Sequence, residues 1–148
     1  MLTIRDMTPA DRVAYGEMAR DFYGGEATLF SLREDMLDAT MAEACSTSPR
    51  TRLLMLELDG ACAGYGNLSF AFSTGAGGLV CWIEEIYIKP ALRGRGLGKQ
   101  YLQWVLDTYR PTCRRFRLEV CPDNPSAARL YESLGFKVLA YQQMMMGE

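Results

Sequence analysis

The chain has 148 residues, a net charge of −2 and no histidine. Its length suits one compact domain, so we expect residues 1–148 to form a single domain. The five cysteines never form a C-x-x-C pair. Without histidine and without such a pair, the chain lacks the usual ligands of a zinc site and the base of Ser/His or Cys/His catalysis. The acidic pI of about 5.3 argues against a nucleic acid partner and favours a cationic small molecule.

Membrane and export signals are missing from the sequence as given. Its apolar runs are far shorter than the ~18–20 residues of a membrane span. The opening MLTIRDMTPADR has neither the basic region nor the apolar region of a secretory signal. We therefore expect a cytoplasmic protein with free thiols, no metal and no membrane partner.

The first half of the sequence predicts one strand and then two helices. Residues 2–5 suit a short strand. The capping pattern Thr8-Pro9-Ala10-Asp11 starts a helix that the pair Gly24-Gly25 ends. A second capping pattern, Ser31-Leu32-Arg33-Glu34, predicts another helix that ends before Pro49.

The second half predicts most of a sheet. The pair Asp59-Gly60 between two apolar runs indicates a hairpin within residues 52–73. The elements expected after it are a strand over 79–89, a helix over 96–109, a strand over 115–121, a helix over 124–134 and a last strand within 136–146. This β-α-α-β-β-β-α-β-α-β order predicts an α/β sandwich with a mixed sheet, because hairpins are antiparallel and helical crossovers parallel.

The glycine-rich run Arg93-Gly94-Arg95-Gly96-Leu97-Gly98-Lys99 joins a predicted strand to a predicted helix. Glycine allows positive φ and close approach of a ligand, and the N–H groups of a helix start attract an anion. The run departs from G-x-G-x-x-G at Lys99 and from the nucleotide P-loop at Gln100. It therefore predicts a phosphate cradle of another kind.

The pattern R-x-x-G-x-G resembles the loop of the GCN5-related N-acetyltransferase (GNAT) superfamily. The preceding I-Y-I-K-P-A-L-R and the segment N-P-S-A-A-R-L-Y-E-S-L-G-F at 124–136 resemble that superfamily too, so the resemblance covers about residues 82–136. It implies the acyl-CoA N-acyltransferase fold, acetyl-CoA as cosubstrate and transfer to a primary amine. Direct attack is expected because the cysteines lack the activating neighbours that an acetyl-enzyme needs.

Coenzyme contacts implied by the resemblance are mostly made by the main chain. The loop amides would bind the pyrophosphate, and the end of the preceding strand would pair with the pantetheine arm. Asn124, a natural N-cap before Pro125, would reach the same arm. The residues expected to contact the coenzyme are Ile86, Tyr87, Ile88, Arg93, Gly94, Arg95, Gly96, Leu97, Gly98, Lys99 and Asn124.

Acetyl transfer also needs a proton acceptor for the amine and a proton donor for the thiolate. Tyr131 stands where the superfamily places its acid. Resemblance to the polyamine acetyltransferase branch favours Glu84 as the base, acting through water, with Glu85 and Glu119 as alternatives. Glu84 and Glu85 are adjacent on a predicted strand, so they point to opposite faces unless a bulge intervenes. Glu119 is expected on the following strand.

The acceptor is expected to be a small cationic amine. Residues 21–26 combine acidic and aromatic side chains in the link between the first two helices, and such groups can hold an ammonium ion. A protein N-terminus or lysine as acceptor, and a non-catalytic acyl-CoA sensor, remain alternatives. The run Met144-Met145-Met146 is typical of a strand that packs into the core or of a homodimer interface.

Overall fold

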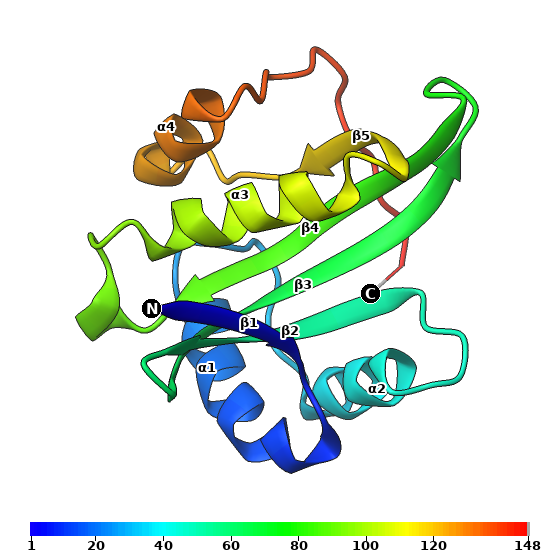
Figure 1. Cartoon of the computed structure of the whole chain (residues 1–148). Helices are drawn as coiled ribbons and strands as arrows, with labels where there is room; N and C mark the ends of the chain where they lie inside the picture. Colours follow the sequence, from blue (N-terminus) through cyan, green and yellow to red (C-terminus); the bar gives the residue numbers. More distant parts are fainter. Residues whose placement is uncertain (148) are drawn as a thin grey trace.

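A computed structural model, which describes residues 1–147, contains a five-stranded mixed sheet (Figure 1). The strands are β1 (Leu2–Asp6), β2 (Thr51–Leu58), β3 (Ala61–Ser73), β4 (Gly78–Ile88) and β5 (Cys113–Leu118), and they lie side by side in that order. The first four pair antiparallel, and β5 runs parallel to β4. The mixed α/β fold expected from the sequence is confirmed.

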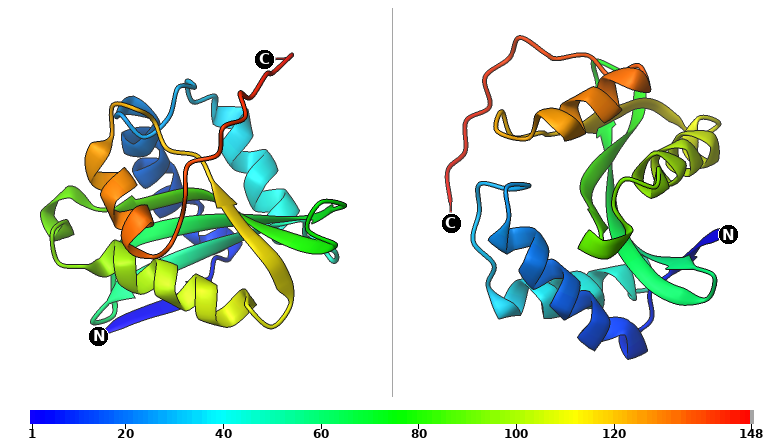
Figure 2. Two further views of the ribbon diagram at one scale, coloured as in Figure 1. Left: turned by 90° about the horizontal axis from the view of Figure 1, so that it is seen from above. Right: turned by 90° about the vertical axis from the view of Figure 1, so that its left-hand side faces the viewer.

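Helices cover both faces of the sheet (Figures 1 and 2). They are α1 (Arg12–Gly24), α2 (Glu34–Ala44), α3 (Leu97–Tyr109) and α4 (Pro125–Ser133), with short 3-10 turns η1 (Pro9–Asp11) and η2 (Pro90–Leu92). Two buried clusters result. One joins α1 and α2 to residues such as Leu53 and Met55 of β2, and the other joins α3 to their neighbours Leu54 and Leu56. The strand is buried on both faces because successive side chains alternate. Within the described residues no helix is long and apolar enough to cross a membrane.

Local sequence signals set several element boundaries as expected. Asp59 and Gly60 form the hairpin turn with φ of 50° and 84°, which matches the two positive φ angles of a two-residue hairpin. Asn124 caps α4, since its side chain accepts a hydrogen bond of 3.3 Å from the Ala127 amide. By contrast, α2 begins at Glu34 after Arg33, so the cap expected at Ser31 is wrong.

The strand expected within residues 136–146 is wrong. This segment carries no strand pairing and runs irregularly past β5 (Figure 1). Val138, Tyr141, Met144 and Met146 are 84–99% exposed, so packing of the methionine run into the core is also wrong. To join the sheet, this segment would have to pair with β5, which is an edge strand. A cavity lies between the segment and β5 and keeps them apart. The homodimer interface stays a prediction.

Strand β5 ends at Leu118, so Glu119 lies beyond the strand on which it was expected. The last paired position of the two parallel strands is Ile83 with Leu118. From there β4 continues to Ile88 while the chain after β5 turns away. The two strands therefore diverge, and the divergence opens the sheet.

Tyr101 on α3 yields a stability prediction. Its side chain is fully buried, and its hydroxyl has no hydrogen-bond partner among residues 1–147. A buried hydroxyl without a partner costs about 1–3 kcal/mol, so we expect Tyr101→Phe to raise the unfolding temperature. Tyr109→Phe on the same helix is the control, because that hydroxyl accepts from Arg52 at 2.7 Å and its removal should lower stability. A lower unfolding temperature for Tyr101→Phe would contradict the prediction and indicate an ordered water.

Candidate active site

The opening between β4 and β5 holds a cavity of about 180 Å³. Its wall is made by the end of β4, the segment that follows β5, one face of α4 with its N-cap, and the region around the end of α1. The lining residues are Phe22, Ala27, Ile83, Glu84, Glu85, Ile86, Glu119, Val120, Cys121, Asn124, Ala127, Leu130 and Tyr131. All three candidate bases and the candidate acid are therefore brought to one place.

A β-bulge explains how two adjacent glutamates reach the same cavity. In the pairing of β3 with β4, Asn67 lies opposite Glu85 and Leu68 lies opposite Ile83, so Glu84 is an extra residue. Such an insertion breaks the strict alternation of side chains along a strand. Glu84 and Glu85 consequently both line the cavity. The bulge is the exception under which the sequence allowed these two neighbours to face the same site.

The two glutamates have different surroundings. Glu84 is exposed and accepts a hydrogen bond of 2.6 Å from the Ser69 hydroxyl. Glu85 accepts hydrogen bonds from the hydroxyls of Tyr23, at 2.7 Å, and Tyr65, at 2.6 Å. Burial raises the pKa of Glu85, although the two tyrosine hydrogen bonds oppose the shift. Burial and the two tyrosine hydrogen bonds therefore act on the pKa of Glu85 in opposite directions.

Tyr131 reaches the cavity from α4. Its ring packs edge-on against Phe136, with the ring centroids 6.2 Å apart, which fixes the side chain on the helix. Burial raises the pKa of the Tyr131 phenol above its ordinary value. The hydroxyl is therefore protonated at neutral pH and is able to donate a proton or a hydrogen bond into the cavity.

The glycine loop lies between η2 and the start of α3. Gly94 and Gly96 have φ of 78° and 77°, the left-handed region that glycine adopts without strain. A Cβ atom at either position would meet no protein atom within 4 Å, so both face open space. Successive backbone N–H groups in this arrangement form an anion-binding concavity. The loop thus fits the diphosphate of a coenzyme, with Leu97 buried and able to offer only its amide.

The charged side chains of the loop differ in their contacts with the rest of the protein. Arg95 and Lys99 are exposed. Arg93 donates to the Ile88 carbonyl at 2.8 Å, and its guanidinium lies 5.5 Å from the centre of the Tyr87 ring. Arg93 thereby fastens the start of the loop to the end of β4. Contact of these three side chains with a coenzyme stays a prediction.

The segment 21–26, expected to form an acceptor-binding link, is divided between a helix and a loop. Helix α1 continues to Gly24. Asp21 on this helix accepts a hydrogen bond of 2.6 Å from the Tyr87 hydroxyl, and Phe22 lines the cavity. Glu26 does not line it. The end of α1 is therefore tied by side chains to β4.

Tyr65 is a site residue that was not expected from the sequence. It lies in the middle of β3, is fully buried, and reaches Glu85 across the pair β3–β4. The one available signal was its place between Gly64 and Gly66, since glycines within a strand mark close approach of another group. A Cβ at Gly64 would lie 2.0 Å from the Tyr87 carbonyl oxygen.

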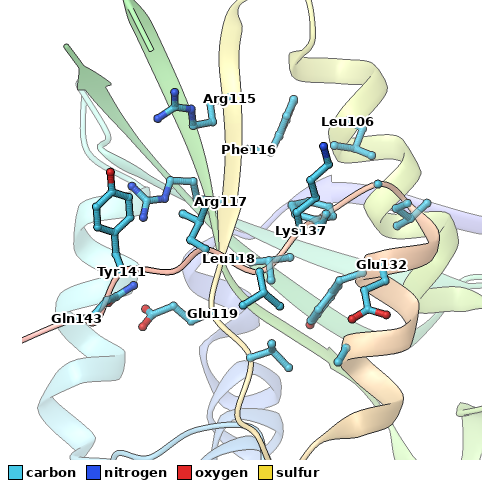
Figure 3. A pocket seen from close by; sticks show the side chains of 18 of the residues that line it. Leu106, Arg115, Phe116, Arg117, Leu118, Glu119, Glu132, Lys137, Tyr141 and Gln143 are labelled. Atoms are coloured by element: carbon cyan, nitrogen blue, oxygen red, sulfur yellow. The ribbon is translucent and has the colours of Figure 1, made fainter. Parts of the chain in front are cut away.

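A larger cavity of about 920 Å³ lies on the other side of β5, between this strand, α4 and the C-terminal segment (Figure 3). Arg115, Arg117 and Lys137 extend along its wall. It shares Glu119 and Tyr131 with the smaller cavity, so the two adjoin. Basic side chains repel a cation, so a cationic ligand would approach the shared residues from the glutamate side.

A family model described as the acetyltransferase (GNAT) family matches residues 15–136. The chain belongs to this family. The prediction from the glycine loop and the 124–136 segment is thereby confirmed. Both segments of this GNAT protein that carried the resemblance lie within the match, and so do all the residues that line the smaller cavity.

Curated relatives include acetyltransferases named for small amines. Thialysine N-epsilon-acetyltransferase of Sus scrofa is 32% identical over 111 residues, which cover 69% of this chain and 65% of the relative. The spermine/spermidine N(1)-acetyltransferase of Bacillus subtilis is 33% identical over 60 residues, 38% of each protein. The match to the pig enzyme thus spans just under two thirds of that relative.

Solved structures share the fold at low sequence identity. An aminoglycoside N-acetyltransferase in complex with CoA superimposes with a TM-score of 0.78 at 19% identity, covering 99% of this chain and 95% of that one. A ribosomal-protein-alanine N-acetyltransferase from Brucella melitensis gives 0.79 at 13% identity, covering 100% and 99%. These likenesses support the fold of the whole chain.

Proposed function

We propose that this GNAT protein transfers the acetyl group of acetyl-CoA to the primary amine of a small cationic acceptor. The observation that carries the proposal is the cavity between β4 and β5, which three glutamates and Tyr131 line and to which no lysine or arginine contributes. Relatives named for thialysine and for spermine and spermidine support an amine acceptor.

The coenzyme would be held by the loop and the end of β4. The amides of residues 94–99 would bind the diphosphate, and the free side of Ile86–Ile88 would pair with the pantetheine arm, helped by Asn124. Strand β4 has no pairing with β5 beyond Ile83, which supports this role. When bound, acetyl-CoA supplies an acetyl group activated as a thioester.

The amine must be neutral to attack. An alkylammonium with a pKa of about 10.4 costs roughly 4.6 kcal/mol to deprotonate at pH 7. Glu84 would take this proton through a water molecule. Its exposure supports the role, because an exposed carboxylate keeps access to solvent. Glu119, which also lines the cavity, is the second candidate.

Tyr131 would supply the proton at the other end of the reaction. A leaving thiolate has a conjugate-acid pKa of about 8.5, so hydrogen bonding from a phenol stabilises it as it forms. Because burial raises the pKa of Tyr131, the phenol is protonated and able to donate to the sulfur as it departs. Tyr131 is therefore proposed as the general acid.

The proposal predicts both binding and turnover. A ligand that binds only the folded state adds about 2.7 kcal/mol of stability at a hundredfold excess over Kd, so acetyl-CoA should raise the unfolding temperature. Release of CoA thiol should then require an amine, tested on a panel of alkylamines, diamines, a lysine peptide and a peptide with a free N-terminus. The five cysteines require a matched reaction without amine as the thiol control.

The panel also separates the alternatives. If only the peptides are acetylated, the acceptor is a protein and not a small amine. Stabilisation by acetyl-CoA without thiol release from any amine would replace the enzyme by an acyl-CoA sensor.

A further inference from the structure

Glu85 is held by two phenols from different elements. Tyr23 on α1 donates to one carboxylate oxygen at 2.7 Å, and Tyr65 on β3 donates to the other at 2.6 Å. A phenol has a single hydrogen to donate, and an ionised carboxylate only accepts. With one phenol hydrogen directed at each oxygen, the arrangement fits the ionised form of Glu85.

The surroundings of Glu85 supply hydrogen bonds but no positive charge. Aromatic rings enclose it on the α1 side: the Tyr65 ring centroid lies 5.2 Å from that of Tyr15 and 6.3 Å from that of Phe22. The titratable groups that face it are Tyr15 and Tyr23 from α1, Tyr65 from β3, Glu84 from β4, and Glu119, Cys121 and Tyr131 across the cavity. Among the described residues no lysine or arginine pairs with Glu85.

A partly buried carboxylate without a counter-charge costs stability. Ionisable groups in such surroundings cluster at functional sites, where a ligand can supply the missing charge. Glu85 also lines the cavity in which the acceptor is proposed to react. An ammonium group is the ligand that would satisfy both the charge and the remaining lone pairs of its oxygens.

We propose that Tyr23 and Tyr65 are positioning residues that keep Glu85 ionised and fixed at the cavity wall, where it binds the ammonium group of the acceptor. The proposal rests on the proposed function and adds the group that recognises the amine. It assigns Glu85 to amine binding and leaves proton removal to Glu84. It also gives the end of α1 a role in the site, because Tyr23 is the link between that helix and Glu85.

The two tyrosines act on Glu85 through its protonation. Burial raises the pKa of Glu85, and the phenol hydrogen bonds lower it. Loss of either hydroxyl therefore raises the pKa further, and Glu85 becomes neutral at a higher pH. A neutral Glu85 binds the ammonium poorly, so the amine KM should rise on the acidic side while kcat changes little.

The experiment is the pH profile of kcat/KM for an alkylamine that the wild type acetylates, with Tyr23→Phe and Tyr65→Phe as variants. We expect the acidic limb of the profile to move to higher pH by on the order of one unit in both variants. At a pH on the acidic side of the limb, this shift corresponds to a KM that is about tenfold higher than that of the wild type. Tyr15→Phe is the control. Its ring lies in the same cluster, but the hydroxyls that donate to Glu85 are those of Tyr23 and Tyr65, so the acidic limb of Tyr15→Phe should stay with that of the wild type.

Glu85→Gln adds a readout that does not depend on turnover. Because the pKa of Glu85 is raised in the folded protein, its ionisation destabilises the fold as pH rises through that pKa. The glutamine variant does not ionise at this position and therefore does not lose this stability. The difference in unfolding temperature, Glu85→Gln minus wild type, should therefore increase from acidic to neutral pH. In kinetics Glu85→Gln should raise KM, whereas Glu84→Gln should lower kcat and recover partly at alkaline pH.

The outcomes separate this inference from the proposed function. If the wild type acetylates the amine but neither phenylalanine variant moves the acidic limb, the inference is overturned and the proposed function stands. An equal shift in Tyr15→Phe would overturn it as well, because the effect would then belong to the aromatic cluster. If no amine supports thiol release from the wild type, the proposed function and the inference fall together.

Discussion

Tyr131→Phe is expected to lower kcat by roughly 10²–10⁴-fold, the usual contribution of a general acid. The change removes one hydroxyl and keeps the ring, so the edge-on contact with Phe136 and the packing of α4 should survive. The hydroxyl lies outside the glycine loop, so the affinity for acetyl-CoA should be nearly unchanged. The measurement is kcat from CoA thiol release, together with the thermal shift given by acetyl-CoA.

The pattern of these two readouts identifies the role of Tyr131. Low kcat with an intact thermal shift is the result that general acid catalysis predicts. Turnover equal to that of the wild type would leave Tyr131 with a packing role alone. A lost thermal shift would instead make its hydroxyl part of the coenzyme site.

Gly96→Val is expected to abolish the stabilisation by acetyl-CoA. Gly96 has a φ of 77°, where a β-branched residue is strained, and its Cβ would enter the open space that faces the loop. The side chain would occupy the place where the diphosphate must approach the backbone. The measurement is the change in unfolding temperature at a hundredfold excess of acetyl-CoA over the wild-type Kd.

Gly77→Val is the matched control for backbone strain. Gly77 has a φ of 66° in the β3–β4 hairpin, and its Cβ also would meet no protein atom within 4 Å. The two variants should lose similar amounts of stability, on the order of 1–2 kcal/mol. Only Gly96→Val should lose the ligand effect. An undiminished shift in Gly96→Val would show that the coenzyme binds away from this loop.

Signals that depend on neighbouring residues could be read from the sequence. Asn124 caps α4 because its side chain accepts from the Ala127 amide three residues later. Asp59 and Gly60 form the hairpin turn because their positions demand positive φ. The glycine loop before α3 has the same local character. Such features need only a few consecutive residues, and the family was identifiable from two of them.

The site required the tertiary structure, because its chemistry depends on residues that are distant in the chain. The bulge at Glu84 arises from the pairing of β4 with β3 and brings Glu84 and Glu85 to one cavity. The hydrogen bonds of Tyr65 and Tyr23 to Glu85 span 20 and 62 positions of sequence. No local pattern records them.

The last segment is a case in which the sequence predicts an element that the tertiary structure does not form. Residues 136–146 have the apolar character of a strand, yet a strand forms only where a neighbour offers its backbone groups. Here a cavity separates the segment from β5, and the segment stays unpaired. The sequence thus determined the local turns, caps and loop of this protein, while the divergence of β4 from β5 decided where its cavities lie and which side chains meet in them.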